Sequence, residues 1–175
     1  MKALRLLLLS ISVAISAHAQ QPANSTQLQR QRDGDNPIFK LVVNVVQRTT
    51  KAINYRHHNG ATKVDFRGTA LLPDARGEAK VESKSGYIEI EVEFDELQPA
   101  TRFGPEYLTY VMWAITPEGR ATNLGEIILT GTKSKLNVTT ELQAFGLIVT
   151  AEPYFAVSQP SDVVTMENFI RKHTV

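Results

Sequence analysis

The sequence predicts an all-β fold, an immunoglobulin-like antiparallel β-sandwich that follows a cleaved signal peptide. Short β-branched runs begin at Ile38 and are separated by Gly, Pro and Asn turn signals at intervals of ~8–12 residues, which is typical of sandwiches. Apolar and charged residues alternate over 77–95, as they do in half-buried strands. After the signal peptide no segment has the 3.6-residue apolar period of a convincing helix, and 141–145 offers one helical turn at most.

The first 19 residues match a secretory signal peptide. Lys2 and Arg5 precede an apolar run over 6–17, and Ala17, His18 and Ala19 form an A-x-A cleavage site. The run is well short of the ~20 residues that a membrane-spanning helix needs, so we expect no transmembrane helix in the mature chain. The sequence therefore predicts a bacterial protein that is periplasmic or secreted.

Composition divides the rest of the chain into three zones. Residues 20–36 are rich in Gln, Asn, Ser, Arg and Asp, and we expect them to form a disordered leader. Residues 37–170 form the predicted β-sandwich domain, and 171–175 a flexible tail. The sequence leaves the oligomeric state open.

The absence of cysteine removes several chemistries. Thiol catalysis, thiolate zinc sites, iron–sulfur clusters and a lipid anchor on cysteine all need that side chain. Removal of residues 1–19 would take away two of the 19 basic residues and none of the 18 acidic ones, which leaves no basic excess for nucleic acid. We expect no cofactor, no metal and no nucleic-acid partner.

The clearest local prediction is a hairpin over 77–95, with Ser85-Gly86 as a two-residue turn. Alternation places the apolar residues of both strands on one face and the charged residues on the other. The resulting register pairs Val81 with Ile90 and Ala79 with Val92 on the buried face, and Lys80 with Glu91 and Glu82 with Glu89 on the wet face.

The run 107–115 (YLTYVMWAI) is apolar at both alternating sets of positions, which predicts a central strand covered on both faces. The turn Thr116-Pro117-Glu118-Gly119 follows it, and a further strand is expected at 121–129. The remaining strands are predicted at 38–46, 51–56, 63–70, 134–140, 146–152 and 163–168.

Several groups that could carry chemistry have a simpler structural interpretation. Four acidic residues, Glu89, Glu91, Glu93 and Asp95, could attract calcium, but they lie ~6.8 Å apart along one strand, which favours a solvated face. The pair His57-His58 precedes an Asn-Gly turn signal and lacks further ligands at metal-binding spacing. No G-x-S-x-G elbow and no phosphate-binding glycine motif is present. We therefore predict no catalytic residue.

Aromatic residues suggest where a ligand or partner could bind. The set Phe103, Tyr107, Tyr110 and Trp113, followed by Tyr154 and Phe155, could line a carbohydrate or peptide groove, although core packing is the favoured interpretation, above all for Trp113. Charged residues near the ends of the central strand are candidates for exposed loop contacts. The predicted contact residues are Arg102, Glu106, Tyr107, Arg120, Tyr154 and Phe155.

The stretch 47–168 resembles a β-sandwich domain of exported acidobacterial envelope proteins, which often precedes an OmpA-like domain. The residues that carry the resemblance are 48–55 (RTTKAINY), 66–69 (FRGT), 77–81 (GEAKV), 98–111 (QPATRFGPEYLTYV), 123–126 (NLGE) and 152–157 (EPYFAV). The resemblance implies a place in the periplasm or at the outer membrane, and it implies no catalytic residues. The sequence ends at Val175 without an OmpA-like domain, so peptidoglycan anchoring is not expected to carry over.

These observations favour a non-enzymatic exported module of the cell envelope, which docks to a protein partner or to cell-wall glycan through loops at one end of the sandwich. One alternative is a carbohydrate-binding or adhesion domain, which exposure of Tyr107, Tyr154 or Phe155 in a groove would favour. The second alternative is a periplasmic enzyme, which would need titratable groups to converge in a pocket, for example His57 or His58 with Glu106 or Asp95.

Overall fold

The computed structural model describes residues 29–33, 36–43, 48–56 and 60–169 of the 175-residue chain. Within them the chain forms eleven β-strands and one short 3-10 helix, η1 (Ala100–Phe103). The strands are β1 (Gln29–Asp33), β2 (Asn36–Val43), β3 (Arg48–Asn54), β4 (Ala61–Gly68), β5 (Arg76–Ser83), β6 (Ile88–Asp95), β7 (Thr109–Ile115), β8 (Ala121–Ile127), β9 (Ser134–Thr140), β10 (Ala144–Glu152) and β11 (Val164–Phe169). The predicted all-β, antiparallel fold is confirmed.

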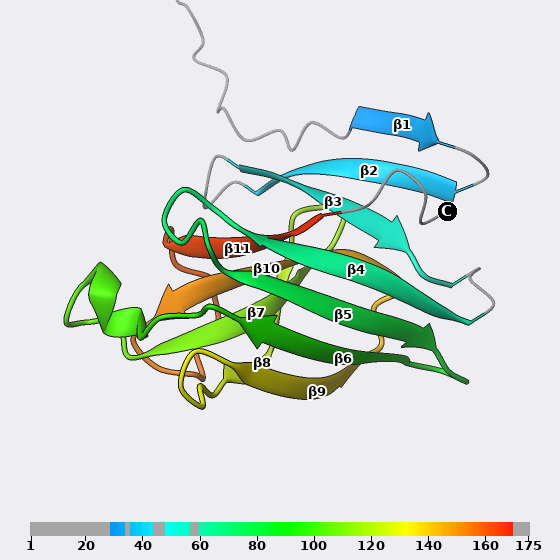
Figure 1. Ribbon diagram of the computed structural model, residues 1–175. Helices are drawn as coiled ribbons and strands as arrows, with labels where there is room; N and C mark the ends of the chain where they lie inside the picture. Colours follow the sequence, from blue (N-terminus) through cyan, green and yellow to red (C-terminus); the bar gives the residue numbers. More distant parts are fainter. Residues whose placement is uncertain (1–28, 34–35, 44–47, 57–59, 170–175) are drawn as a thin grey trace, which may run out of the picture.

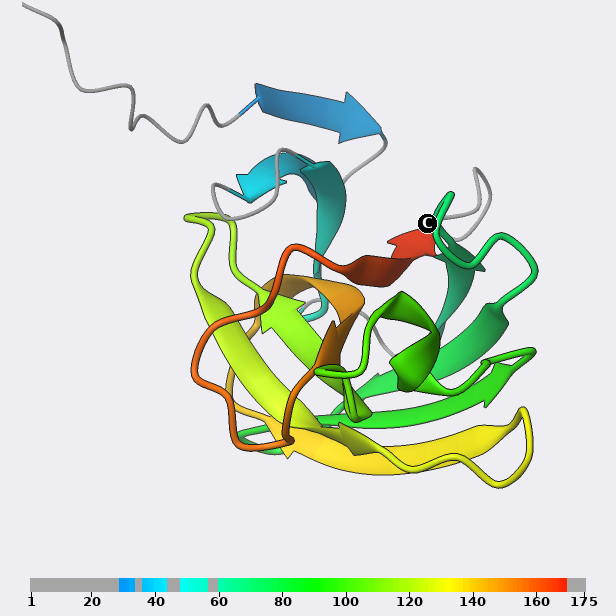
Figure 2. The same cartoon turned by 90° about the vertical axis from the view of Figure 1, so that its left-hand side faces the viewer.

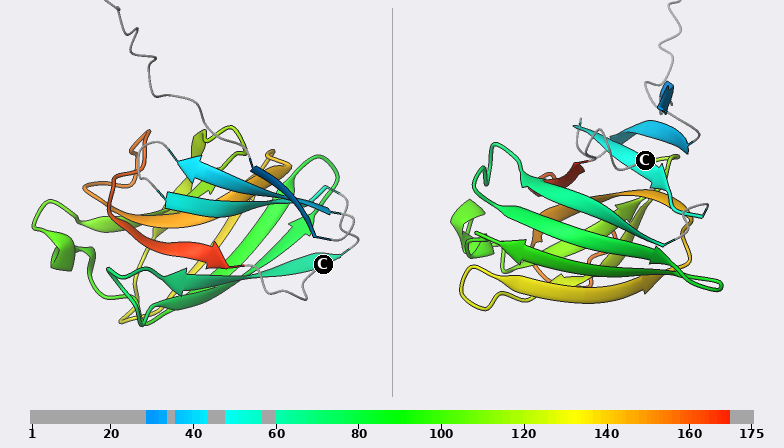
Figure 3. Two further views of the ribbon diagram at one scale, coloured as in Figure 1. Left: turned by 90° about the horizontal axis from the view of Figure 1, so that it is seen from above. Right: turned by 45° about the vertical axis from the view of Figure 1, so that its right-hand side comes forward.

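Eight of the strands form one antiparallel sheet in the order β8-β7-β10-β11-β4-β5-β6-β9. Its two edge strands, β8 and β9, lie against each other without a backbone hydrogen-bond ladder, so the sheet is nearly closed into a barrel (Figure 1). The first residues of β10 also pair with β3, which continues through β2 to β1. The right panel of Figure 3 brings β4, β5, β6 and β9 to the front as neighbouring strands.

Because neighbouring strands run in opposite directions, the loops between them gather at two ends of the barrel. The loops 69–75, 96–108, 128–133 and 153–163 lie at one end, which we call the η1 end because η1 belongs to the second of them. Figure 2 looks onto this end. The loops between β5 and β6, between β7 and β8, and between β9 and β10 lie at the opposite end, which we call the hairpin end.

The hairpin of β5 and β6 has the predicted register on both faces. Val81 lies opposite Ile90 and Ala79 opposite Val92, and Lys80 and Glu82 lie opposite Glu91 and Glu89. The turn residue Gly86 has φ +94°, a left-handed conformation that glycine adopts at little cost. Lys84 contacts both Glu82 and Glu89, at 2.7 Å and 3.5 Å, which offsets the repulsion between the two glutamates.

The strand β7 is covered on both faces, as the sequence predicts. Tyr110, Met112 and Ala114 point into the barrel and join its main core, whereas Val111 and Trp113 pack on the outer face against a second core. That second core also contains side chains from three other strands, Ala52, Ile148 and Val164. The unbroken apolar run from Tyr110 to Ile115 of β7 therefore reflects two different packed layers.

Glycine is required at one position inside the barrel. Gly77 lies in register between Phe66 and Phe94, whose rings pack edge to face with centroids 5.1 Å apart. A Cβ on Gly77 would lie 2.7 Å from the ring of Phe94 and 2.8 Å from the carbonyl oxygen of Glu93. The ring of Phe94 and the backbone of β6 occupy the space that a side chain would need.

The observed strands agree with the predicted ones to within a few residues from β3 onward. The expected helical turn at 141–145 is wrong, because 141–143 is irregular and β10 begins at Ala144. The helix η1 was not predicted. Within the predicted leader, Gln29–Asp33 forms β1, whereas the signal peptide and residues 171–175 lie outside the described residues. Among the described residues there is no helix of the length and apolarity that a membrane span requires.

Candidate functional site

Large apolar side chains are exposed mainly at the η1 end. Within 51–56 and 60–169, the residues whose side chains the structure describes, six such side chains are exposed, and five of them come from the four loops at this end. The five are Leu71, Leu108, Ile128, Tyr154 and Phe155, with exposed fractions of 39%, 68%, 72%, 57% and 59%. The sixth, Tyr87 at 41%, lies at the hairpin end. We call these five side chains the apolar loop surface.

The loop that carries Tyr154 and Phe155 is fixed at its middle. The side-chain amide of Asn123 in β8 donates to the carbonyl oxygens of Phe155 and Val157, at 2.8 Å and 2.9 Å. The loop therefore crosses the outer face of β7 to reach β8, and these bonds hold its backbone against the barrel. The aromatic side chains of Tyr154 and Phe155 point to solvent from a fixed backbone.

The same loop is fixed at its return by a buried carboxylate. Glu152, at the end of β10, accepts hydrogen bonds from the backbone N–H of Ser161 at 2.7 Å and from the hydroxyl of Thr150. Ser161 in turn donates its hydroxyl to the carbonyl oxygen of Ala151 at 2.7 Å. Thr150 also accepts a hydrogen bond from the indole of Trp113, so the loop is tied to the second core.

Leu108 and Ile128 lie beside each other where β7 begins and β8 ends. The backbone N–H of Leu108 donates to the carbonyl oxygen of Glu152 at 2.9 Å, which also places Leu108 close to the start of the aromatic loop. Both side chains line a groove of about 320 Å³ together with Ala100 and Leu129. The groove lies against η1 and is mainly apolar.

Leu71 is exposed because its neighbour Leu72 is buried. The loop after β4 turns tightly: Thr69 donates its hydroxyl to the carbonyl oxygen of Val164 at 2.8 Å and accepts from the N–H of Leu71. A Cβ at Gly68 would lie only 1.8 Å from the carbonyl oxygen of Leu72, so this turn needs glycine. With Leu72 in the core, Leu71 must point outward.

The structure brings most of the predicted contact residues to the η1 end. Arg102 and Glu106 are exposed in the η1 loop, Tyr107 is half-buried beside them, and Tyr154 and Phe155 belong to the apolar loop surface. Burial, and then the carboxylates of Asp162, Glu106 and Glu152, raise the pKa of Tyr107 above its usual value.

Arg120 does not join them. It lies at the hairpin end, where its carbonyl oxygen closes the turn between β7 and β8 by accepting from the N–H of Thr116.

Sequence reasoning missed Leu71, Leu108 and Ile128. Leu108 was placed inside the predicted central strand, and Ile128 inside the strand predicted at 121–129. The doublets Leu71-Leu72 and Ile127-Ile128 offered a signal, because adjacent residues on extended backbone point to opposite sides and only one can enter the core.

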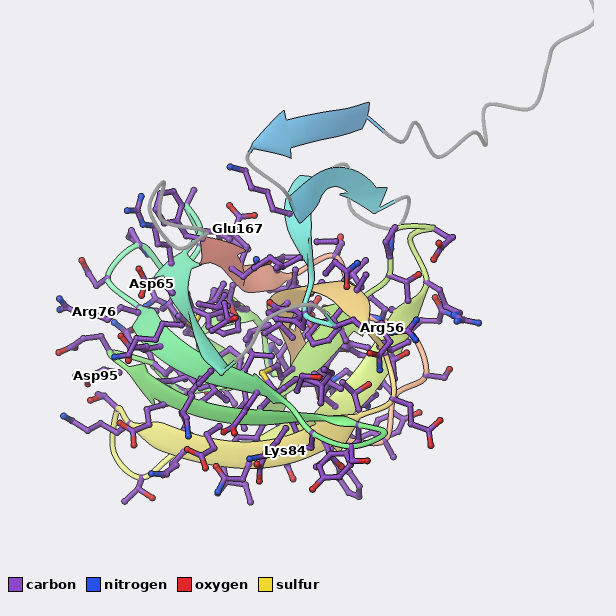
Figure 4. The ribbon with its side chains drawn as sticks, turned by 90° about the vertical axis from the view of Figure 1, so that its right-hand side faces the viewer. Arg56, Asp65, Arg76, Lys84, Asp95 and Glu167 are labelled. Atoms are coloured by element: carbon purple, nitrogen blue, oxygen red, sulfur yellow. The ribbon has the colours of Figure 1, made fainter. Side chains whose placement is uncertain are left out.

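A second concave surface runs across β4, β5, β6 and β9 on the outside of the barrel. Its volume is about 740 Å³, and acidic and basic side chains line both of its walls. Figure 4 labels three of them, Asp65, Arg76 and Asp95, on adjacent strands along this side.

The ion pairs of this charged groove lie within the sheet face. Lys63 contacts Glu78 at 2.8 Å, and the other pairs, Lys135–Glu93 at 2.9 Å and Lys133–Asp95 at 3.4 Å, join β6 to β9 or to the residue before it. With the Lys84–Glu89 contact described above, three members of the predicted acidic row are paired with lysine, as expected of a solvated strand face. In the described part of the chain, no three His, Asp or Glu side chains are placed to hold a metal ion.

The residues named for an enzyme do not all fall within the described chain. His57 and His58 lie outside the described residues. Asp95 lines the charged groove, whereas Glu106 is in the η1 loop and is not among the residues that line it.

The chain matches no protein-family model, no curated protein and no solved structure.

Proposed function

We propose that this protein is a non-enzymatic module of the bacterial cell envelope that docks through the apolar loop surface. The observation that carries the proposal is that five of the six exposed large apolar side chains within 51–56 and 60–169 occupy the four loops of one end. Exposed apolar side chains that gather at one place mark interaction sites, whereas scattered single ones do not.

Rigidity of the loops supports a docking role. Ordering a flexible loop on binding costs free energy, and a loop that is already fixed avoids that cost. Asn123 fixes the middle of the aromatic loop and Glu152 fixes its return. The backbone that carries Tyr154 and Phe155 is therefore already ordered before a partner binds. Tyrosine and phenylalanine are side chains that protein interfaces favour.

The location proposed is the periplasm or the exterior of the cell, with association to the outer membrane. The signal-peptide pattern of residues 1–19 and the resemblance to exported acidobacterial domains support it. The partners that the sequence suggests are an envelope protein and cell-wall glycan, and the experiment below separates the two.

The test uses the absence of native cysteine. Single-cysteine variants Tyr154→Cys and Tyr87→Cys place one thiol at each end of the barrel, both at exposed tyrosines. Each variant is coupled to a photo-crosslinker and exposed to envelopes of the source organism. We expect Tyr154→Cys to crosslink to an envelope component that Tyr87→Cys does not reach. Equal labelling from both ends would overturn the proposal.

A carbohydrate-binding or adhesion domain is the second candidate. Tyr154 and Phe155 are both more than half exposed, as a sugar-stacking surface requires. Neither the apolar groove by η1 nor the charged groove includes them. Titration with soluble muropeptides tests this candidate. A change in tyrosine fluorescence that is lost in Tyr154→Ser would support it, and unchanged fluorescence at saturating glycan would exclude it.

For the fold, the immunoglobulin-like sandwich is the finer description that we propose. Support comes from the interior, where Met112 and Leu147 of β7 and β10 share one core with Val64 and Ile90 of β4 and β6. In this description the barrel is a flattened sandwich. An experimental structure with β8 and β9 unpaired would support it, and a hydrogen-bonded β8–β9 pair would make the fold a closed barrel instead.

A further inference from the structure

The apolar loop surface extends around the η1 end over four loops. Figure 2 shows the loop between β10 and β11 on one side of this end, the loops after β4 and β8 on the other, and η1 between them. Leu108 and Ile128 line one groove beside η1, and the N–H of Leu108 is bonded to Glu152, at the start of the loop that carries Phe155. Leu71 lies in the loop after β4, on the other side of η1.

The loops that carry the apolar side chains also expose charged ones. These are Asp74, Glu96, Arg102, Glu106, Lys133 and Asp162, and each of the four loops contributes at least one. The centre of a protein–protein interface is depleted of charge, and its strongest contacts cluster in the middle. An apolar surface that shares all four of its loops with exposed charges does not have this arrangement.

We propose that the apolar loop surface binds the lipid surface of an envelope membrane, an inference that rests on the docking role proposed above. A lipid–water interface is fluid and broad, so apolar side chains that are spread over one end can enter it together without a matching shape. Tyrosine suits this boundary because its ring is apolar and its hydroxyl stays wet.

The backbone of these loops suits the same environment. A peptide group that enters a poorly hydrated layer must have its hydrogen bonds satisfied within the protein. In the loop after β8, Thr130 and Lys133 exchange two backbone hydrogen bonds, at 2.7 Å and 3.2 Å. In the loop after β4, Leu72 donates to Thr69 and accepts from Ala75. The exposed side chains therefore sit on turns whose backbone is bonded internally.

The charges at this end specify the class of lipid. Acidic residues outnumber basic ones among the exposed loop residues, so an anionic headgroup gains no net attraction. Insertion of apolar side chains supplies the affinity, and the headgroups are zwitterionic. Binding of this kind is insensitive to salt, because no ion pairs with lipid are being screened.

The test is co-sedimentation of the exported, purified protein with vesicles of phosphatidylcholine and phosphatidylethanolamine. We expect the protein to sediment with these vesicles, and to do so equally at low and high sodium chloride. Phe155→Ser and Leu108→Ser should each weaken partitioning about tenfold, because each removes a large apolar side chain from the interface. Tyr87→Ser, which removes an exposed tyrosine at the hairpin end, should leave partitioning unchanged.

Three results would overturn the inference: no sedimentation with any vesicle, sedimentation that needs an anionic lipid and disappears in salt, or an equal effect of Tyr87→Ser. The single-cysteine crosslinking experiment separates this failure from failure of the docking role. If Tyr154→Cys crosslinks to one envelope protein while vesicles bind nothing, the lipid partner is wrong and docking stands. If both ends label alike and vesicles bind nothing, both proposals fall.

Discussion

The indole N–H of Trp113 donates a hydrogen bond to the hydroxyl of Thr150 at 2.8 Å, on the outer side of the barrel. Both residues are fully buried, although they lie outside the main core. The hydroxyl of Thr150 donates a hydrogen bond to the carboxylate of Glu152, which also accepts one from the backbone N–H of Ser161. The only tryptophan of the chain is therefore a built-in reporter of how the loop between β10 and β11 is held.

Thr150→Val should destabilise the protein by about 2–3 kcal/mol, because it leaves the indole N–H and the Glu152 carboxylate each short of a partner in a buried site. Chemical denaturation followed by Trp113 fluorescence measures the change. Thr139→Val, at an exposed position on β9, is the matched control and should stay within about 0.5 kcal/mol of the parent. Equal stability of the two variants would contradict the buried network.

Tyr55→Phe should leave stability unchanged or raise it by up to about 1 kcal/mol. The hydroxyl of Tyr55 is buried and has no hydrogen-bond partner among the described residues, while the ring packs against Phe145. This burial raises the pKa of Tyr55 far above its usual value. Removal of an unsatisfied polar atom relieves its desolvation penalty without loss of packing. A fall in the urea midpoint would show that this hydroxyl does have a partner.

Gly77→Ala should destabilise the fold by about 1–3 kcal/mol, since the new methyl group would overlap the ring of Phe94 and the carbonyl oxygen of Glu93. Thermal unfolding measures the effect. Phe94→Leu in the same chain should recover part of the loss, because it removes the ring and leaves the carbonyl contact in place. If the changes in unfolding free energy of Gly77→Ala and Phe94→Leu simply add, the ring of Phe94 does not occupy the space beside Gly77.

Asn123→Ala should free the loop between β10 and β11. Both hydrogen bonds from this amide end on loop carbonyls, so their loss should raise hydrogen exchange over 153–157 while the barrel strands keep their protection. Vesicle partitioning should weaken as well, because Tyr154 and Phe155 would have to be ordered on binding. Unchanged exchange in the loop would show that other contacts hold it.

Glu82 should titrate below its usual pKa of 4.5, because Lys84 hydrogen-bonds its carboxylate and the charges of Lys84 and Lys80 add to the effect. A lowered pKa in the folded state means that the interaction stabilises the protein above the unfolded value and is lost as the pH falls through the folded one. Carbon-detected NMR titration measures it. Lys84→Met should move Glu82 back toward 4.5 and leave Glu93, which pairs with Lys135, unchanged.

Local patterns in the sequence were enough to predict the strands. Glu89, Glu91 and Glu93 alternate with Ile90 and Val92, and one turn glycine then sets every pair of the hairpin. The order of strands could not be read in this way, because β10 pairs with β7, β11 and β3, and none of these contacts leaves a periodic trace in the chain.

The candidate site was only partly predictable for a related reason. Core packing, the interpretation favoured for the aromatic set, is correct for Tyr110 and Trp113. It is wrong for Tyr154 and Phe155, which follow Pro153 in a loop and are more than half exposed. Arg120 and Arg102 were grouped because both flank one strand, yet the two ends of a strand lie at opposite ends of a barrel. Leu108 continues the apolar run of the predicted central strand, so its sequence suggested a strand residue. In the structure β7 begins one residue later, and the N–H of Leu108 bonds to the carbonyl oxygen of Glu152.

Around the barrel, the seam between β8 and β9 is the place where two neighbouring strands lack a hydrogen-bonded ladder. Gly125 of β8 faces Val138 and Leu136 of β9 across this seam, and a Cβ at Gly125 would lie 3.7 Å and 3.9 Å from their side chains. A force that pulls β8 away from β9 would therefore meet side-chain packing alone. Under such a force the sheet should open along this line before any hydrogen-bonded pair of its strands separates.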